Sequence, residues 1–478
     1  MPPLPFLKTR LMIGLLCAAL MGCAQLPVEQ GRASVAERLD VDAAALANVD
    51  EVGDGPLDPA LRAQLEQPLS ADAAVALAWR NSPRVKAALA KLGLAAADWW
   101  QERRPRNPVI SYAQLGNGES RERTLGLHWA LTDLLLLPAR RQVAEQDWRA
   151  ATASVVGMLQ DEATAVRRDY YHYQAAIQVA AMRAAVADAA QLSADLAERF
   201  HRAGNISELQ LAREQANAIE ARHEAAQAKG RRLAARMALA ERLGLAGRSN
   251  RWSVPEQLPL PVALDLPVEA LLQQAREQRQ DLLAARLRLD SASARWRLTR
   301  RSGWLDELEL ELEREREGSE RRDGIGLGLA LPLFDQGQAA RGRRQARQQI
   351  AQQRVTQIEQ RIEGQVRTRA AQLQTQAEII DSYAQALLPA RQRIVQRETE
   401  RYNFMLIGVF ELLEARRSEF DSWERYFEAI ADYWITHAEL GQALGRPLAL
   451  PDSPQLTPPI EQIVAPAGAN AGSHHGHH

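Results

Sequence analysis

The sequence predicts a mainly α-helical chain that contributes four β-strands to a transmembrane barrel. Three observations lead to this fold class. Two stretches alternate apolar and polar residues with period two, long stretches carry apolar residues in steps of three and four, and the whole order of elements occurs twice. The 59 basic and 60 acidic residues are balanced, which argues against a nucleic-acid partner.

The clearest alternation lies in a hairpin over residues 305–334. Its first strand alternates leucines with four glutamates, which are Glu307, Glu309, Glu311 and Glu313. Its second strand alternates aliphatic residues with glycine and alanine. Because successive side chains of a strand point to opposite faces, one face is aliphatic and the other carries carboxylates. Such a hairpin suits a wall with lipid on one side and a water-filled lumen on the other, where the glutamates would lie.

A second hairpin over residues 108–133 repeats this pattern, with Leu125, Leu127, Trp129 and Leu131 on one face of its second strand. An exposed ribbon on a soluble protein would explain either hairpin alone, and the pair favours the barrel. Four strands cannot close a spanning barrel, which needs about eight. Several copies of the chain must therefore share one barrel.

The first 22 residues are expected to be a secretion signal. Lys8 and Arg10 precede an apolar run over residues 11–20 that is too short for a stable transmembrane helix. The segment ends Leu20-Met21-Gly22-Cys23 and resembles a bacterial lipoprotein signal, which implies acylation of Cys23. Ala24 after the cysteine favours the outer membrane by the same resemblance. A plain signal peptide with an incidental cysteine is the alternative.

The first half of the body contains one structural unit. Residues 23–69 are polar and punctuated by prolines, which indicates an extended N-terminal arm. Residues 70–247 are read as a first repeat of helices, the hairpin 108–133, and a long helical hairpin over 138–245. Pro138 is expected to open this helical hairpin.

The second half repeats the order. A linker over residues 248–266 leads to a second repeat over 267–445, with the strand hairpin 305–334 and a long helical hairpin over 337–445. Residues 446–478 are rich in proline and histidine and are expected to form a tail without a core of its own.

The duplicated layout, the helix signature from Ala73 to Pro83, and the turn segments 199–209 and 401–413 resemble the TolC-like outer membrane efflux family, lipoprotein branch. The resemblance covers Ser70 to Gly445. It implies a homotrimer with a twelve-stranded barrel in outer membrane lipids and a helical barrel that extends into the periplasm. The implied function is a passive exit duct for an inner membrane pump and a periplasmic adaptor protein.

The tips of the two helical hairpins are the expected docking site for the adaptor. Glycines let the chain reverse, and apolar residues exposed at a tip indicate a partner. The expected docking residues are Gly204, Ile206, Leu209, Leu406, Gly408 and Leu412.

The sequence contains no catalytic constellation and no phosphate-binding loop, so neither an enzyme nor a bound cofactor is expected. The histidines of the body are scattered and are read as surface or lumen side chains: His128, His172, His201, His223 and His437. Tryptophans before the first and third strands, Trp99, Trp100 and Trp304, suit an interfacial girdle or simple packing.

The chain ends in a histidine cluster that can bind copper, nickel or zinc: His474, His475, His477 and His478. With the acidic lumen, this cluster favours a heavy-metal efflux system, copper included, over a drug efflux system. The alternative is that the histidine cluster is a tag or a neutral tail without a metal-binding role. An exit duct for type I protein secretion is an alternative within the same fold, and a lipid-anchored helical scaffold without a pore is an alternative of another class.

Overall fold

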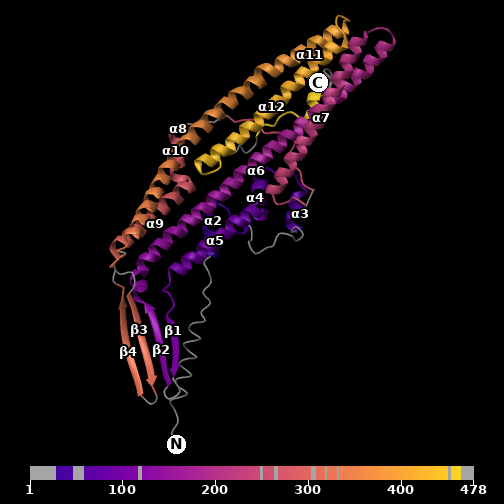
Figure 1. Cartoon of the computed structure of the whole chain (residues 1–478). Helices are drawn as coiled ribbons and strands as arrows, with labels where there is room; N and C mark the ends of the chain where they lie inside the picture. The colour runs from indigo at the N-terminus through magenta and orange to yellow at the C-terminus, as the bar shows by residue number, and fades with distance from the viewer. Residues whose placement is uncertain are drawn as a thin grey trace, which may run out of the picture.

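Long helices lie side by side and a four-stranded sheet extends from one end of them (Figure 1). This computed structural model describes residues 28–46, 59–116, 121–247, 251–262, 267–302, 308–317, 320–330, 333–334, 336–449 and 454–464. Mostly helical structure with a small antiparallel sheet confirms that part of the predicted fold class.

The order of elements in the first half recurs in the second half. The first half runs α4 (Ala71–Asn81), α5 (Pro83–Glu102), β1 (Val109–Gly116), β2 (Arg121–Ala130), α6 (Leu131–Arg202) and α7 (Glu208–Arg242). The second half runs α8 (Val268–Gln278), α9 (Gln280–Ser302), β3 (Leu308–Glu317), β4 (Glu320–Leu329), α10 (Gln338–Ser382), α11 (Leu388–Asn403) and α12 (Val409–Leu444). One π-helical stretch, Tyr383–Leu387, joins α10 to α11.

The two helix pairs α4–α5 and α8–α9 each meet the end of a returning helix at a glycine. Gly244 follows α7 with a φ of +67°, and a Cβ there would lie 2.6 Å from the Asn81 carbonyl oxygen. Gly445 follows α12 with a φ of +85°, and its Cβ would lie 2.8 Å from the Gln278 carbonyl carbon. Only glycine combines this left-handed backbone with such close approach. The glycines therefore fix where each long hairpin joins its short helices.

The N-terminal arm is not simply extended, which corrects the prediction. It contains α2 (Val28–Leu39), a short 3-10 turn (Ala43–Ala45) and α3 (Pro59–Leu65). Val35 and Ala36 of α2 are buried in a small apolar cluster with Val156 and Leu159 of α6. Tertiary packing, rather than local propensity, stabilises this helix.

Helix α6 begins at Leu131, so the prediction that Pro138 opens it is wrong. A proline inside a helix removes one backbone hydrogen bond. The first turns are held by contacts from outside the helix, because Thr132 Oγ1 accepts a hydrogen bond from the Leu308 backbone N–H at 2.8 Å. Arg106, which precedes β1, also forms an ion pair with Asp133 at 3.1 Å. The helix has 72 residues and is therefore about 108 Å long.

The main core lies where α6, α7, α8, α10 and α12 pack together, and it is rich in aromatic side chains. Tyr171 of α6 stacks on Trp434 of α12 with ring centroids 5.8 Å apart. Part of the C-terminal tail joins this core, since Thr457 pairs with Leu258 of the linker and Ile463 of α13 (Ile460–Val464) is buried. Within the described ranges, no helix carries an apolar stretch long enough to cross a membrane.

Candidate functional site

The sheet has the strand order β1-β2-β3-β4, with all neighbours antiparallel. In β3 and β4, Glu309, Glu311 and Glu313 lie opposite glycines, which are Gly328, Gly326 and Gly324. Leu308, Leu310 and Leu312 lie opposite Leu329, Leu327 and Ile325. The structure therefore brings the three glutamates to one face of the sheet and the leucines to the other. Glu307 lies outside the described residues.

The apolar face of the sheet is exposed in the single chain. Ile325 is 80% exposed, Leu327 70% and Ile110 72%. Leu125 and Leu127 of β2 continue this face between β1 and β3. Burying such a face from water is favourable by roughly 25 cal/mol per Å². A band of this size on a soluble surface marks a contact with another apolar phase or protein.

The polar face carries a hydrogen-bonded chain across three strands. His128 Nδ1 of β2 lies 3.2 Å from Glu311 Oε1 of β3. Its other ring nitrogen, Nε2, lies 3.1 Å from Ser111 Oγ of β1. A Cβ at the neighbouring Gly126 would lie 2.4 Å from Ser111 Oγ, so glycine makes room for this contact. The sequence offered His128 only as an isolated lumen or surface histidine, because its partners are far away in the chain.

The helix–strand junction carries paired aromatic and basic side chains. The Arg103 guanidinium lies 4.3 Å from the Trp99 ring centroid, and that of Arg104 lies 3.1 Å from the Trp100 centroid. Trp99 also donates a hydrogen bond to Glu145 at 3.0 Å. Both tryptophans are half-buried and pack against the chain, and their place at a membrane interface stays a prediction. Trp304 lies outside the described residues.

The two predicted tips lie at the far end of the helices from the sheet (Figure 1). Gly204 turns the first tip with a φ of +75°. At the second tip the left-handed residue is Met405, with a φ of 56°, whereas Gly408 has a φ of −81° and precedes α12. The prediction that Gly408 provides the reversal is therefore wrong. The left-handed backbone is sterically less favourable for Met405 than for a glycine, because Met405 has a Cβ.

Apolar side chains are displayed at both tips. Leu209 is 62% exposed and Leu406 is 69% exposed. Ile206 and Leu412 are half-buried. Sequence reasoning missed the most exposed side chains of this end, Phe404 at 77% and Met405 at 93%, although both lie in the turn segment it singled out.

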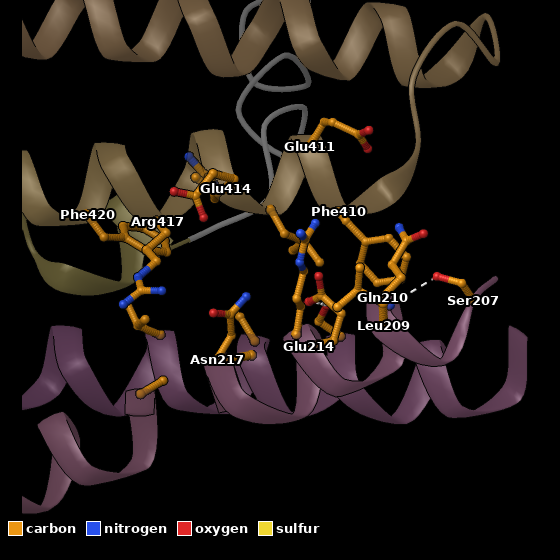
Figure 2. Close-up of a pocket in the computed structure, with 18 residues that line it drawn as sticks. Ser207, Leu209, Gln210, Glu214, Asn217, Phe410, Glu411, Glu414, Arg417 and Phe420 are labelled. Carbon is orange, nitrogen blue, oxygen red and sulfur yellow. Dashed lines mark hydrogen bonds between the residues drawn. The ribbon is translucent and has the colours of Figure 1, made fainter. Parts of the chain in front are cut away.

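A groove of about 570 Å³ lies behind the tips, between α6, α7 and α12. Figure 2 shows Glu214 and Asn217 of α7 on one side of it, and Glu414 and Arg417 of α12 on the other. Phe410 and Leu209 line the groove near the turn. The groove thus combines apolar and charged walls at the end of the bundle.

Arg183 of α6 ties three long helices together close to this groove. Its Nη1 lies 3.0 Å from Glu224 of α7 and 2.9 Å from Asp421 of α12, and its Nη2 contacts Glu424 of α12. Burial alone would lower the pKa of Arg183, but the carboxylates of Glu424, Asp421 and Glu224 raise it above its ordinary value. Burial raises the pKa of Glu424 against the opposing charge of Arg183. The sequence could not reveal this cluster, because it joins helices about 240 residues apart.

His437 is buried, which corrects the prediction of a surface or lumen side chain. It is 5% exposed and packs against Trp434 with ring centroids 5.1 Å apart. Burial, and then the charge of Arg167, lower its pKa to about 4. His172 and His223 are exposed, and His201 hydrogen-bonds the Ile206 carbonyl oxygen at the first tip.

The described part of the chain contains no group of three or more His, Cys, Asp or Glu residues able to hold a metal ion. Cys23 and the histidines of the tail, His474, His475, His477 and His478, lie outside the described residues.

Residues 271–446 match the family model described as outer membrane efflux protein. The matched region is that of an outer membrane efflux protein. This confirms the resemblance seen in the sequence. The family is one of channels, in agreement with the expectation that the chain is not an enzyme.

Solved structures share the fold over most of the chain. A membrane protein from Pseudomonas aeruginosa aligns with a TM-score of 0.68 and 20% identity, covering 78% of this chain and 93% of that one. CusC aligns with a TM-score of 0.63 and 20% identity, covering 79% and 92%. The outer membrane protein VceC from Vibrio cholerae aligns with a TM-score of 0.66 and 17% identity, covering 79% and 96%. A comparison with curated proteins gives no match to the sequence.

Proposed function

We propose that this outer membrane efflux protein is the channel of a tripartite efflux system. Three copies complete a twelve-stranded barrel in the outer membrane, and the helices form a duct in the periplasm. An adaptor protein and an inner membrane pump deliver substrate to the duct. The observation that supports this best is the four-stranded sheet, which has one exposed apolar face, one acidic face and an edge strand on either side.

The unpaired edges of the sheet support a barrel that several copies of the chain close together. Strands β1 and β4 each pair with a single neighbour in the described chain. In lipid, unpaired backbone N–H and C=O groups cost several kcal/mol each, so a spanning sheet has to close. Joining β4 of one copy to β1 of the next satisfies both edges and creates no new one.

The lumen would then carry the acidic ladder in threefold repetition. Rings of carboxylates favour cations over anions in a pore. Together with the histidines of the tail, His474, His475, His477 and His478, this supports heavy-metal cations, copper among them, as the substrate class. The pump supplies the energy, and the channel is passive.

Disulfide trapping between the edges tests the barrel. The natural cysteines, Cys17 and Cys23, lie before the body, so cysteines introduced in the strands have no background there. Tyr112→Cys in β1 is combined in turn with Ile325→Cys, Leu327→Cys and Leu329→Cys in β4, all on the apolar face. Oxidation should yield covalent dimers and trimers for at least one pair, whereas each single variant should yield no trimer. A disulfide requires the two Cα atoms to lie about 4.4 to 6.8 Å apart, so the pair that cross-links identifies the register between β1 and β4.

Single-channel conductance in planar bilayers separates the channel from a scaffold without a pore. Conducting, cross-linked trimers are expected. Folded oligomers that never conduct and never cross-link between β1 and β4 would favour the lipid-anchored scaffold. Neither result distinguishes metal efflux from drug efflux or protein secretion, and cation selectivity of the open channel addresses that question.

A further inference from the structure

A strongly basic surface lies where α9 ends and α10 begins, beside the base of the sheet (Figure 1). We define it by six arginines: Arg297, Arg300, Arg341, Arg343, Arg344 and Arg347. The two helices are in contact here, since Gln348 of α10 hydrogen-bonds Ser293 of α9 at 3.3 Å. Five of the six arginines are exposed in the single chain, and the sixth, Arg344, is half-buried.

Carboxylates that could neutralise this basic surface are scarce among the described residues. Helix α10 contains no aspartate or glutamate before Glu359. Within the described residues, Arg297, Arg343, Arg344 and Arg347 have no carboxylate within ion-pair distance, and the nearby Asp147 is engaged by Arg295 at 2.6 Å. Burial and the positive charges of Arg295, Arg347 and Arg343 lower the pKa of Arg344. The arginines therefore repel one another in the isolated chain.

The corresponding place in the first repeat contains several ion pairs. There, Arg140 of α6 pairs with Glu102 at 3.1 Å, and Arg149 pairs with Glu145 at 3.1 Å. A solvated basic face is the ordinary reading of an arginine cluster. However, clustered like charges in the first turns of a helix oppose both one another and the helix dipole. The second repeat keeps this unfavourable arrangement, which indicates an anionic partner outside the chain.

Apolar side chains link the basic surface to the sheet. Leu333 is 71% exposed and Phe334 is 98% exposed, and both lie between β4 and α10. The Arg300 guanidinium lies 5.0 Å from the Trp296 ring centroid. Apolar band, aromatic residues and arginines thus follow one another along the chain, which is the order expected across a membrane interface.

We propose that this basic surface binds the headgroups of anionic phospholipids in the membrane leaflet nearest the helices. The inference rests on the proposed function, because it requires the sheet to span a membrane. Guanidinium groups bind phosphate oxygens with paired hydrogen bonds and keep their charge at any physiological pH. The occupant is therefore a phosphodiester lipid with net negative charge rather than a zwitterionic lipid.

Native mass spectrometry of the full-length protein in detergent tests the proposal. The protein is incubated with equal amounts of phosphatidylglycerol and phosphatidylcholine, and the ratio of the two bound lipids is measured together with the oligomeric state. The test variant is Arg343→Gln with Arg347→Gln. The matched control is Arg393→Gln with Arg397→Gln, an exposed pair with the same spacing on α11, far from the sheet.

The wild type and the control variant should retain phosphatidylglycerol in preference to phosphatidylcholine. The test variant should lose roughly 25-fold in that preference, since each of the two arginines near an anionic surface contributes roughly fivefold. Equal retention of both lipids by the wild type, or an equal loss in the control variant, would overturn the proposal. Loss of the oligomer in the test variant alone would also overturn it, in favour of a contact between subunits. If no variant, wild type included, were oligomeric while the lipid preference followed the prediction, the proposed trimer would fail and the lipid surface would stand.

Discussion

His128 of β2 lies 3.2 Å from Glu311 of β3 through its Nδ1 atom, although the two residues are 183 positions apart in the chain. This pair joins the strand hairpin of the first repeat to that of the second on the polar face of the sheet. It also gives one of the three described glutamates of the ladder a partner that the other two lack in the described structure. The ladder is therefore built from both halves of the chain.

Replacing Glu309, Glu311 and Glu313 with glutamine should lower the cation selectivity of the reconstituted channel and leave assembly intact. The carboxylates lie opposite glycines on the polar face, so the apolar face keeps its shape. Reversal potentials across a salt gradient measure the selectivity. The difference from wild type should be largest at low salt and small at 1 M, where charges are screened within about 3 Å. An unchanged reversal potential at low salt would place the ladder outside the conduction path.

Leu310→Lys tests the same register from the apolar face. A lysine there should cost on the order of 2 to 4 kcal/mol if the residue lies near the middle of the bilayer. The fraction of protein that forms oligomers in the membrane, seen on semi-native gels, should fall, while the control Leu310→Ile should behave as wild type. Normal assembly of Leu310→Lys would mean that this face does not meet lipid.

At the tips, Leu209→Asp combined with Leu406→Asp should weaken contact with the adaptor, because both side chains are exposed leucines beside the groove and the turn. In vivo cross-linking to the adaptor and efflux should both fall. Leu233→Asp is the matched control, since Leu233 is a 59% exposed leucine on α7 away from the tip. Wild-type cross-linking and efflux in the double variant would place the docking site elsewhere.

Acid should destabilise the protein through His437. Burial, and then Arg167, lower its pKa from 6.5 to about 4, so the folded state resists protonation. Its contribution is complete above about pH 6.5 and is lost as the pH falls toward 4, a span worth about 3 kcal/mol. His437→Gln should flatten the dependence of the thermal unfolding midpoint on pH between 4.5 and 7. His223→Gln, which changes an exposed histidine, should leave that dependence as in wild type, and an unchanged slope in His437→Gln would show that other groups determine it.

Cys23→Ser should abolish acylation without abolishing the oligomer, because in the proposed channel the barrel inserts into the membrane without the lipid. Mass spectrometry of the mature amino terminus measures the modification. A wild-type terminus that is unmodified, or that begins at another residue, would refute the lipoprotein assignment.

The strands could be predicted because their signal is local. Leu308, Leu310 and Leu312 alternate with glutamates, and in a strand this alternation puts the leucines on one face and the glutamates on the other. The structure shows this arrangement. The helix breaks at Pro83, Gly204 and Gly445 could also be predicted from the sequence, because the backbone constraints of proline and glycine act within a few residues.

The sequence by itself thus determined the mostly helical structure with a small antiparallel sheet, the duplicated order of elements and the two faces of the sheet. Only the tertiary structure decided the features that depend on contacts between distant segments. Helix α6 extends back to Leu131 because β3 supports its first turn, α2 forms because α6 covers its apolar side, and His128 and Arg183 acquire partners from other helices and strands. Local propensity is worth tenths of a kcal/mol per residue, whereas losing a packed core side chain or one partner of a buried ion pair costs several kcal/mol. Distant contacts therefore override local signals wherever the two conflict.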